Sequence, residues 1–181
     1  GYIYDANGID SKKLDFILQL KRVHRGRISE YAEKFNCKFA KGAPWGVQCD
    51  IALPCATQNE LTELDAKQLI KNNCIAVAEG ANMPSTAEAI NHFQLHKILF
   101  APGKASNAGG VAVSGLEMSQ NSLRIKWSRK EVDSKLQEIM KSIHSTCVQY
   151  GKQKDYIDYV KGANIGGFIK IADSMLDQGL V

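Results

Sequence analysis

The chain has 181 residues, 44% of them hydrophobic, which is enough to bury a sizeable core and excludes a disordered or fibrous sequence. Its 23 basic and 19 acidic residues are mixed along the chain, and the net charge of +4 gives no general signature of nucleic-acid binding. No apolar run reaches the ~18 residues of a membrane span and no charged-then-apolar leader opens the sequence, so we expect no nucleic-acid and no membrane partner.

The amino-terminal part of the chain predicts two helices and a short strand. Asp10 or Ser11 can cap the first helix, which we expect Gly26 to close in the left-handed conformation. The second helix carries apolar residues at helical spacing over residues 28–35, and residues 37–40 form a brief candidate strand.

The middle of the chain alternates strands with helices. Residues 49–54, 74–78 and 97–100 are apolar runs typical of buried strands, and helical segments 60–72 and 85–93 lie between them. This order is typical of right-handed parallel units in an α/β protein.

Each predicted strand ends in a turn of small and polar residues, at positions 56–58, 80–82 and 103–107. Ligands of open parallel sheets bind beyond the carboxyl ends of the strands, so the three turns are expected to meet at one edge. Their amide and hydroxyl groups suit a ribose, a carboxamide or a carboxylate. Thr57 is also expected to cap the helix that follows.

A glycine-rich helix is predicted after the third turn, with Ser106 as its cap and one face formed by Asn107, Val111, Ser114, Met118 and Asn121. Each of its three glycines costs about 1 kcal/mol relative to alanine. Two interpretations stay open on spacing alone: a small polar ligand held against the helix, or a tightly packed internal helix whose glycines admit a neighbour.

The rest of the chain predicts two helices. Ser128 can cap a long helix that residues 150–153 end, and residues 161–167 precede a final helix.

Few residues are candidates for chemistry. No G-x-G-x-x-G motif follows a strand, and no Ser/His/Asp or metal-ligating cluster is evident. His92, His96 and His144 are interpreted as surface or packing residues, and Cys55 has no evident histidine partner that would make it a nucleophile. The five cysteines show no metal-site spacing and are typical of reduced thiols in a cytoplasmic protein.

Three segments resemble the glutamate dehydrogenase family, in its hexameric NADP-type branch: Ala52–Glu60, Ala78–Thr86 and Asn107–Asn121. They occur in the family's order, and the similarity extends over essentially the whole chain. The resemblance implies a Rossmann-like parallel sheet that lacks its first strand–helix unit and is followed by carboxyl-terminal helices.

Against this family, the chain resembles only the carboxyl-terminal part of a longer enzyme, and it begins at Gly1 without a methionine. The implied domains are residues 1–121, the remaining part of the NAD(P)-binding domain with the glycine-rich helix, and residues 122–181, helices that pack back toward a missing substrate domain.

The resemblance also implies ligand contacts. Contacts to the nicotinamide ribose and carboxamide fall on Ala56, Thr57, Gln58, Asn82 and Asn107. Substrate contacts fall on Val111, along the carbon chain, and on Ser114, through the distal carboxylate. The family's catalytic lysine and aspartate belong to the missing part, so no catalytic residue is assigned here, and the chain alone is expected to be inactive.

Basic side chains concentrate at residues 21–27, where cations are favourable at a helix end for dipole reasons alone. NADP-type relatives place basic residues here to meet the adenosine 2′-phosphate, and Lys21 and Arg27 match that pattern. His24 stands where an arginine is often found. The resemblance therefore implies NADP, with NAD as the alternative.

The implied activity is the reversible NADP-dependent oxidative deamination of L-glutamate to 2-oxoglutarate and ammonia, by a cytoplasmic homohexamer. One alternative is a related dehydrogenase of the leucine or phenylalanine type, which has no need of the Ser114 hydroxyl. The other is a non-catalytic binding or assembly module that uses the basic run for an acidic partner.

Overall fold

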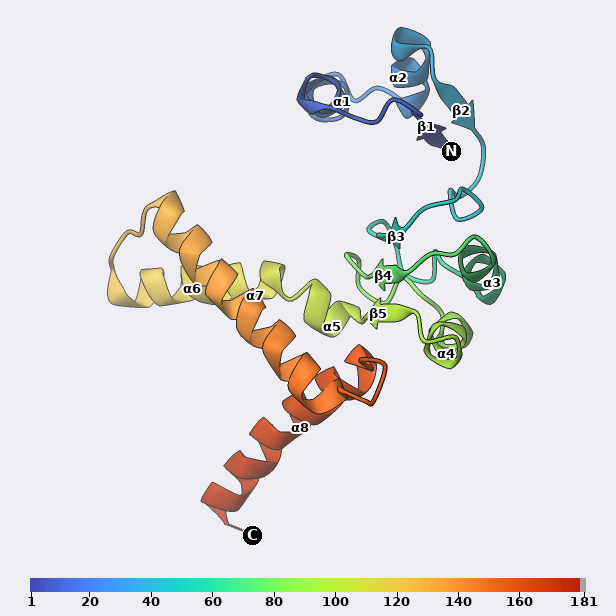
Figure 1. Ribbon diagram of the computed structural model, residues 1–181. Helices are drawn as coiled ribbons and strands as arrows, with labels where there is room; N and C mark the ends of the chain where they lie inside the picture. Colours follow the sequence, from blue (N-terminus) through green and yellow to red (C-terminus); the bar gives the residue numbers. More distant parts are fainter. Residues whose placement is uncertain (180–181) are drawn as a thin grey trace. The chain divides into compact units, whose positions relative to one another are not determined.

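The computed structural model describes residues 1–179, which form two units that divide between Val47 and Gln48 (Figure 1). The first unit contains an antiparallel strand pair, and the second contains a parallel sheet followed by long helices. The predicted α/β class, with a parallel sheet and carboxyl-terminal helices, is confirmed.

In the first unit, β1 (Tyr2–Tyr4) pairs antiparallel with β2 (Lys38–Ala40), and α1 (Ser11–Arg22) and α2 (Ile28–Phe35) lie between them in the chain. Helix α2 contacts both strands and α1. The predicted strand at residues 37–40 is therefore confirmed, as one strand of an antiparallel pair.

The core of this unit is aromatic and contains one buried carboxylate. The Tyr31 ring is fully buried and lies 4.6 Å from the Phe35 ring. Asp5 accepts hydrogen bonds from Lys13 Nζ at 2.6 Å and from the Tyr31 hydroxyl at 2.7 Å, and these bonds lower its pKa. Burial and the bond to Asp5 raise the pKa of Tyr31 to about 12.

The ends of α1 agree only partly with the sequence prediction. Asp10 caps the helix, because its side chain accepts from Lys13 N at 2.8 Å. The left-handed residue after the helix is Arg25, with a φ of 54°, and not Gly26. Gly26 serves close approach instead, since a Cβ there would overlap the Leu20 side chain.

In the second unit, β3 (Ile51–Ala52), β4 (Ala76–Ala78) and β5 (Leu99–Ala101) form a parallel sheet in the order β3-β4-β5. Ala52 lies beside Val77, and Val77 beside Phe100. The crossover helices α3 (Glu63–Lys71) and α4 (Ala87–Leu95) pack on each other. The predicted parallel β-α-β-α-β order is confirmed.

Both crossover helices begin later than the sequence predicts. Thr62, not Thr57, caps α3, and Thr86 caps α4. Asn59 has a φ of 56°, and Leu61 N donates to Pro84 O at 2.9 Å, so this stretch is held as an irregular turn beside the next loop.

The glycine-rich segment consists of two helices, α5 (Gly103–Ser106) and α6 (Gly109–Leu123), rather than one. Ser106 therefore does not cap the long helix. Its hydroxyl donates to the Glu79 carbonyl at 2.6 Å, which ties the end of α5 to the end of β4.

Two long helices complete the unit. Ser128 caps α7 (Arg129–Gly151), as predicted, and α8 (Tyr159–Gln178) begins before the stretch expected to precede it. The glycines of this stretch are part of the helix because they allow α8 to pack closely on α7. A Cβ on Gly162 would overlap the Cys147 carbonyl, and one on Gly166 would overlap Thr146.

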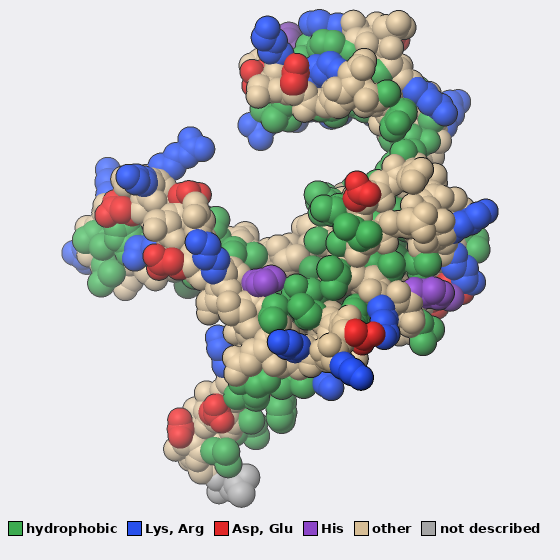
Figure 2. Space-filling model, viewed as in Figure 1, with side chains coloured by type: hydrophobic (Ala, Val, Ile, Leu, Met, Phe, Trp, Pro, Cys, Tyr) green, Lys and Arg blue, Asp and Glu red, His purple; other side chains and the backbone are tan. Residues whose placement is uncertain are grey.

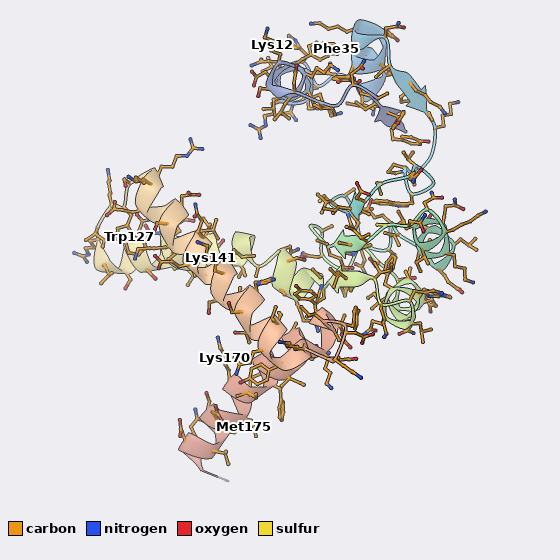
Figure 3. All side chains as sticks on the ribbon, viewed as in Figure 1. Lys12, Phe35, Trp127, Lys141, Lys170 and Met175 are labelled. Atoms are coloured by element: carbon orange, nitrogen blue, oxygen red, sulfur yellow. The ribbon has the colours of Figure 1, made fainter. Side chains whose placement is uncertain are left out.

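Helices α6 and α8 leave large apolar side chains open to solvent. Val111 and Met118 on α6 are 74% and 71% exposed, and Figure 2 shows hydrophobic side chains along α8. Met175, labelled on α8 in Figure 3, is 59% exposed. Within residues 1–179, no helix combines the length and the hydropathy needed to cross a membrane.

Candidate functional site

A crevice of about 900 Å³ lies beyond the carboxyl ends of β3, β4 and β5, as the sequence pattern predicts. Its walls are the turns after the three strands and the first residues of α6. The lining residues are Cys55, Ala56, Thr57, Gln58, Gly80, Ala81, Asn82, Ser106, Asn107, Gly109, Gly110 and Val111. All five residues expected at the nicotinamide are therefore brought together, with Val111 beside them.

Two asparagines from different turns form a side-chain pair in the crevice. Asn107 Nδ2 donates to Asn82 Oδ1 at 2.8 Å and to the Gly80 carbonyl at 3.2 Å. These bonds leave the NH₂ group of Asn82, with its two N–H donors, and the amide oxygen of Asn107, an acceptor, available to a ligand. The pair can thus match a group that carries both an acceptor and a donor, such as a carboxamide.

The turn after β3 is organised by Glu60. Its carboxylate accepts from the backbone N–H of Ala56 at 2.7 Å and of Thr57 at 3.3 Å. The side chains of Thr57 and Gln58 remain exposed at the crevice. The first wall of the crevice therefore offers hydroxyl and amide groups, which suit a ribose.

Of the three glycines of α6, only Gly109 lies against another helix within residues 1–179, since a Cβ there would be 3.6 Å from the Leu136 side chain of α7. A Cβ on Gly110 or Gly115 would meet nothing within 4 Å, and α6 has no buried residue. Gly110 lines the crevice, so a side chain there would take up space open to a ligand. Of the two interpretations left open by the spacing, the ligand-facing helix agrees with this geometry.

A family model described as glutamate/leucine/phenylalanine/valine dehydrogenase matches residues 1–179. The chain belongs to this dehydrogenase family.

Individual relatives agree with this assignment. The chain is 64% identical over 183 residues to a glutamate dehydrogenase of Bacteroides thetaiotaomicron and 61% identical over 182 residues to an NAD(P)-specific glutamate dehydrogenase of Xylanibacter ruminicola. These alignments cover 100% and 99% of the chain but 41% of each relative. A solved glutamate dehydrogenase of Plasmodium falciparum is 49% identical with a TM-score of 0.92, over 100% of this chain and 40% of that one. The chain thus spans about two fifths of the length of its dehydrogenase relatives.

Three of the residues expected to bind ligands lie outside the crevice lining. Ser114 is exposed on α6, one turn after Val111. Lys21 and Arg27 belong to the other unit of the chain and are exposed. Lys21 Nζ donates to the Gly26 carbonyl at 3.1 Å, so this side chain is bonded to the loop that follows its own helix.

His92, His96 and His144 each have a hydrogen-bond partner within the chain. His92 Nε2 lies 3.0 Å from Glu63 Oε1, and His144 Nε2 lies 3.2 Å from the Tyr159 hydroxyl. Among residues 1–179, no group of three or more His, Cys, Asp and Glu could hold a metal ion.

Sequence reasoning overlooked Glu79. The residue is 4% exposed, and its carboxylate accepts two backbone hydrogen bonds, from Ser85 N and Gly103 N, next to the turns of the crevice. The available signal was its position, since it immediately follows a buried strand and precedes a glycine.

Proposed function

We propose that the chain is the carboxyl-terminal part of an NADP-dependent glutamate dehydrogenase that interconverts L-glutamate with 2-oxoglutarate and ammonia. The observation that carries the proposal is the crevice, which unites the predicted residues of three separate motifs at one sheet edge. The high identity to glutamate dehydrogenases over the whole chain supports the substrate class.

The residues present fit a nicotinamide nucleoside. Thr57 and Gln58 would hydrogen-bond the ribose, and the Asn82–Asn107 pair would hold the carboxamide. Gly110 leaves room for the ring, because a Cβ there meets no protein atom and would project at the crevice wall. When bound, the nicotinamide supplies the acceptor or donor of the hydride.

Helix α6 would connect the cofactor site to the substrate site. Val111 lines the crevice, and Ser114 follows it by one helical turn, so the two side chains share a face. Val111 would pack along the carbon chain of glutamate, and the Ser114 hydroxyl would donate to its distal carboxylate.

The basic residues favour NADP over NAD. Lys21 and Arg27 would form charge-assisted hydrogen bonds with a 2′-phosphate. The Xylanibacter ruminicola relative is named for both cofactors, which supports keeping NAD as the alternative.

The catalytic lysine and aspartate would belong to the part of the enzyme outside this chain. Residues 1–121 would complete the cofactor domain, and residues 122–181 would pack toward the substrate domain. The exposed apolar side chains of α8 support this arrangement, because such surfaces are usually covered. We further propose a homohexamer in the cytoplasm.

A chimeric enzyme tests the proposal. This chain would replace the matching segment of the Bacteroides thetaiotaomicron enzyme, and NADPH-dependent amination of 2-oxoglutarate would be measured. We expect turnover, and we expect Asn107→Ala to raise the KM for NADPH about tenfold through lost hydrogen bonds.

The matched control is Asn91→Ala on α4, an exposed asparagine outside the crevice, which should leave the KM unchanged. A folded chimera that aminates leucine-type oxoacids but not 2-oxoglutarate would contradict the proposed substrate. A folded chimera with no response to NADPH or NADH would contradict the dehydrogenase function.

A further inference from the structure

Glu79 is a buried carboxylate at the carboxyl end of β4. The residue is only 4% exposed, and none of the ion pairs formed by residues 1–179 includes it. A buried charge without a cation is unfavourable unless hydrogen bonds compensate for the lost water. Its surroundings should therefore reveal what the charge stabilises.

The compensation comes from backbone groups of two different turns. Glu79 Oε2 accepts from Gly103 N at 2.6 Å, and Oε1 accepts from Ser85 N at 3.2 Å. Short bonds to a charged acceptor are stronger than bonds between neutral groups. One side chain thus joins the turn after β4 to the beginning of α5.

The main chain of Glu79 strengthens the same connection. Its N–H donates to Ala101 O at 3.1 Å, and its carbonyl accepts from Ser106 Oγ at 2.6 Å. The close approach depends on a glycine, because a Cβ on Gly103 would lie 3.0 Å from Ala81 O and 3.2 Å from Glu79 Oε2.

The two turns that Glu79 joins carry the two asparagines of the crevice. Asn82 lies between Glu79 and Ser85, and Asn107 directly follows Ser106. Their 2.8 Å hydrogen bond requires the turns to keep a fixed separation. Glu79 itself does not line the crevice, although it lines a neighbouring cavity of about 620 Å³ together with both asparagines. It therefore acts on a ligand in the crevice through these residues.

We propose that Glu79 is a positioning residue, which holds Asn82 and Asn107 in the geometry that binds the nicotinamide carboxamide. This inference rests on the proposed function. Glu79→Gln is the variant of choice, because glutamine keeps the shape but turns an NH₂ group toward one of the two N–H donors.

The experiment uses the chimeric enzyme and measures NADPH affinity by fluorescence titration, together with backbone amide exchange. In the Glu79→Gln variant we expect roughly five- to thirtyfold weaker NADPH binding, as one or two disrupted hydrogen bonds imply. We also expect faster exchange at Ser85 and Gly103. Since Glu79 acts through Asn107, Glu79→Gln should weaken binding much less in an Asn107→Ala background.

The control is Leu69→Ala, which removes a buried side chain of α3 without touching the crevice. It should lower the melting temperature but leave NADPH affinity unchanged, which separates positioning from general stability.

Three results would overturn the inference. The first is an unchanged NADPH affinity in Glu79→Gln, and the second is fully additive effects of Glu79→Gln and Asn107→Ala on that affinity. The third is backbone amide exchange at Ser85 and Gly103 of the unsubstituted chimera that is as fast as at exposed amides. The last remains decisive even if the variant does not fold. Absence of NADPH binding in the unsubstituted chimera would instead reject the proposed function, and the role of Glu79 with it.

Discussion

At the scale of single residues, Ser114 is the side chain that would distinguish glutamate from apolar amino acids. It is exposed on α6 one turn after Val111, and its hydroxyl makes no hydrogen bond within residues 1–179. Ser114→Val in the chimera should lower kcat/KM for glutamate tenfold or more, because hydrogen bonds to charged groups contribute about 1.5–3 kcal/mol. Activity with norvaline should fall less, and steady-state kinetics with both substrates provides the measurement.

Ser119→Val is the matched control, since Ser119 lies on the same helix and its hydroxyl donates to the Gly115 carbonyl of its own turn. It should leave the glutamate-to-norvaline ratio unchanged. An equal loss with both substrates in Ser114→Val would remove the carboxylate contact from the proposal.

At the scale of elements, the packing of α7 against α8 depends on glycines that the sequence alone could not interpret. Gly162 lies so close to α7 that a Cβ would overlap the Cys147 carbonyl, whereas a Cβ on Gly167 would meet nothing within 4 Å. Gly162→Ala should therefore destabilise the protein by about 1–3 kcal/mol through overpacking. Gly167→Ala should stabilise it by roughly 0.5–1 kcal/mol through helix propensity.

Urea denaturation of the two variants in the chimera checks this contrast, because both substitutions add one methyl group to the same helix. Equal effects would mean that the close approach of the helices does not determine stability. Gly110 and Gly115 of α6 face open space, as Gly167 of α8 does, whereas Gly162 and Gly166 of α8 lie against α7. Glycine content alone therefore predicts neither helix packing nor a ligand site.

The start of α3 shows why a local sequence pattern was insufficient to place the beginning of a helix. Thr57 with Glu60 and Thr62 with Asp65 both fit the spacing of a capping box. The chain uses the second, because the left-handed Asn59 and the pairing of Leu61 with Ser85 keep the first stretch irregular. The choice between the two threonines depends on a neighbouring loop, which no local pattern contains.

At the scale of the whole molecule, topology made the crevice predictable. Parallel strands end at one edge, so the turns that contain Thr57, Asn82 and Asn107 had to converge once the strand order was correct. Glu79 was not predictable in the same way. A carboxylate after a strand is normally solvated, and its burial depends on where α5 and the turn before α4 close over it.

The exposed apolar surface predicts how the chain behaves by itself. Phe168 and Leu176 on α8 are 67% and 73% exposed, and Leu123 at the end of α6 is 62% exposed. Surfaces of this kind are usually covered by a partner or promote association. We therefore expect the isolated chain to bind a hydrophobic dye, to self-associate and to show no dehydrogenase turnover.

Complementation with the remaining part of an enzyme tests whether the exposed apolar surface is a contact with that part or only a surface that promotes self-association. The part of the Bacteroides thetaiotaomicron enzyme that this chain does not match, which we propose to be its amino-terminal segment, would be co-expressed with it. If α6 and α8 pack on that segment, dye binding falls and NADPH-dependent amination appears in the same complex. A Phe168→Asp variant should prevent both, because it places a charge on the apolar face, whereas Lys170→Asp on the same helix should impair them less. Turnover without loss of dye binding would show that the added segment does not cover this face.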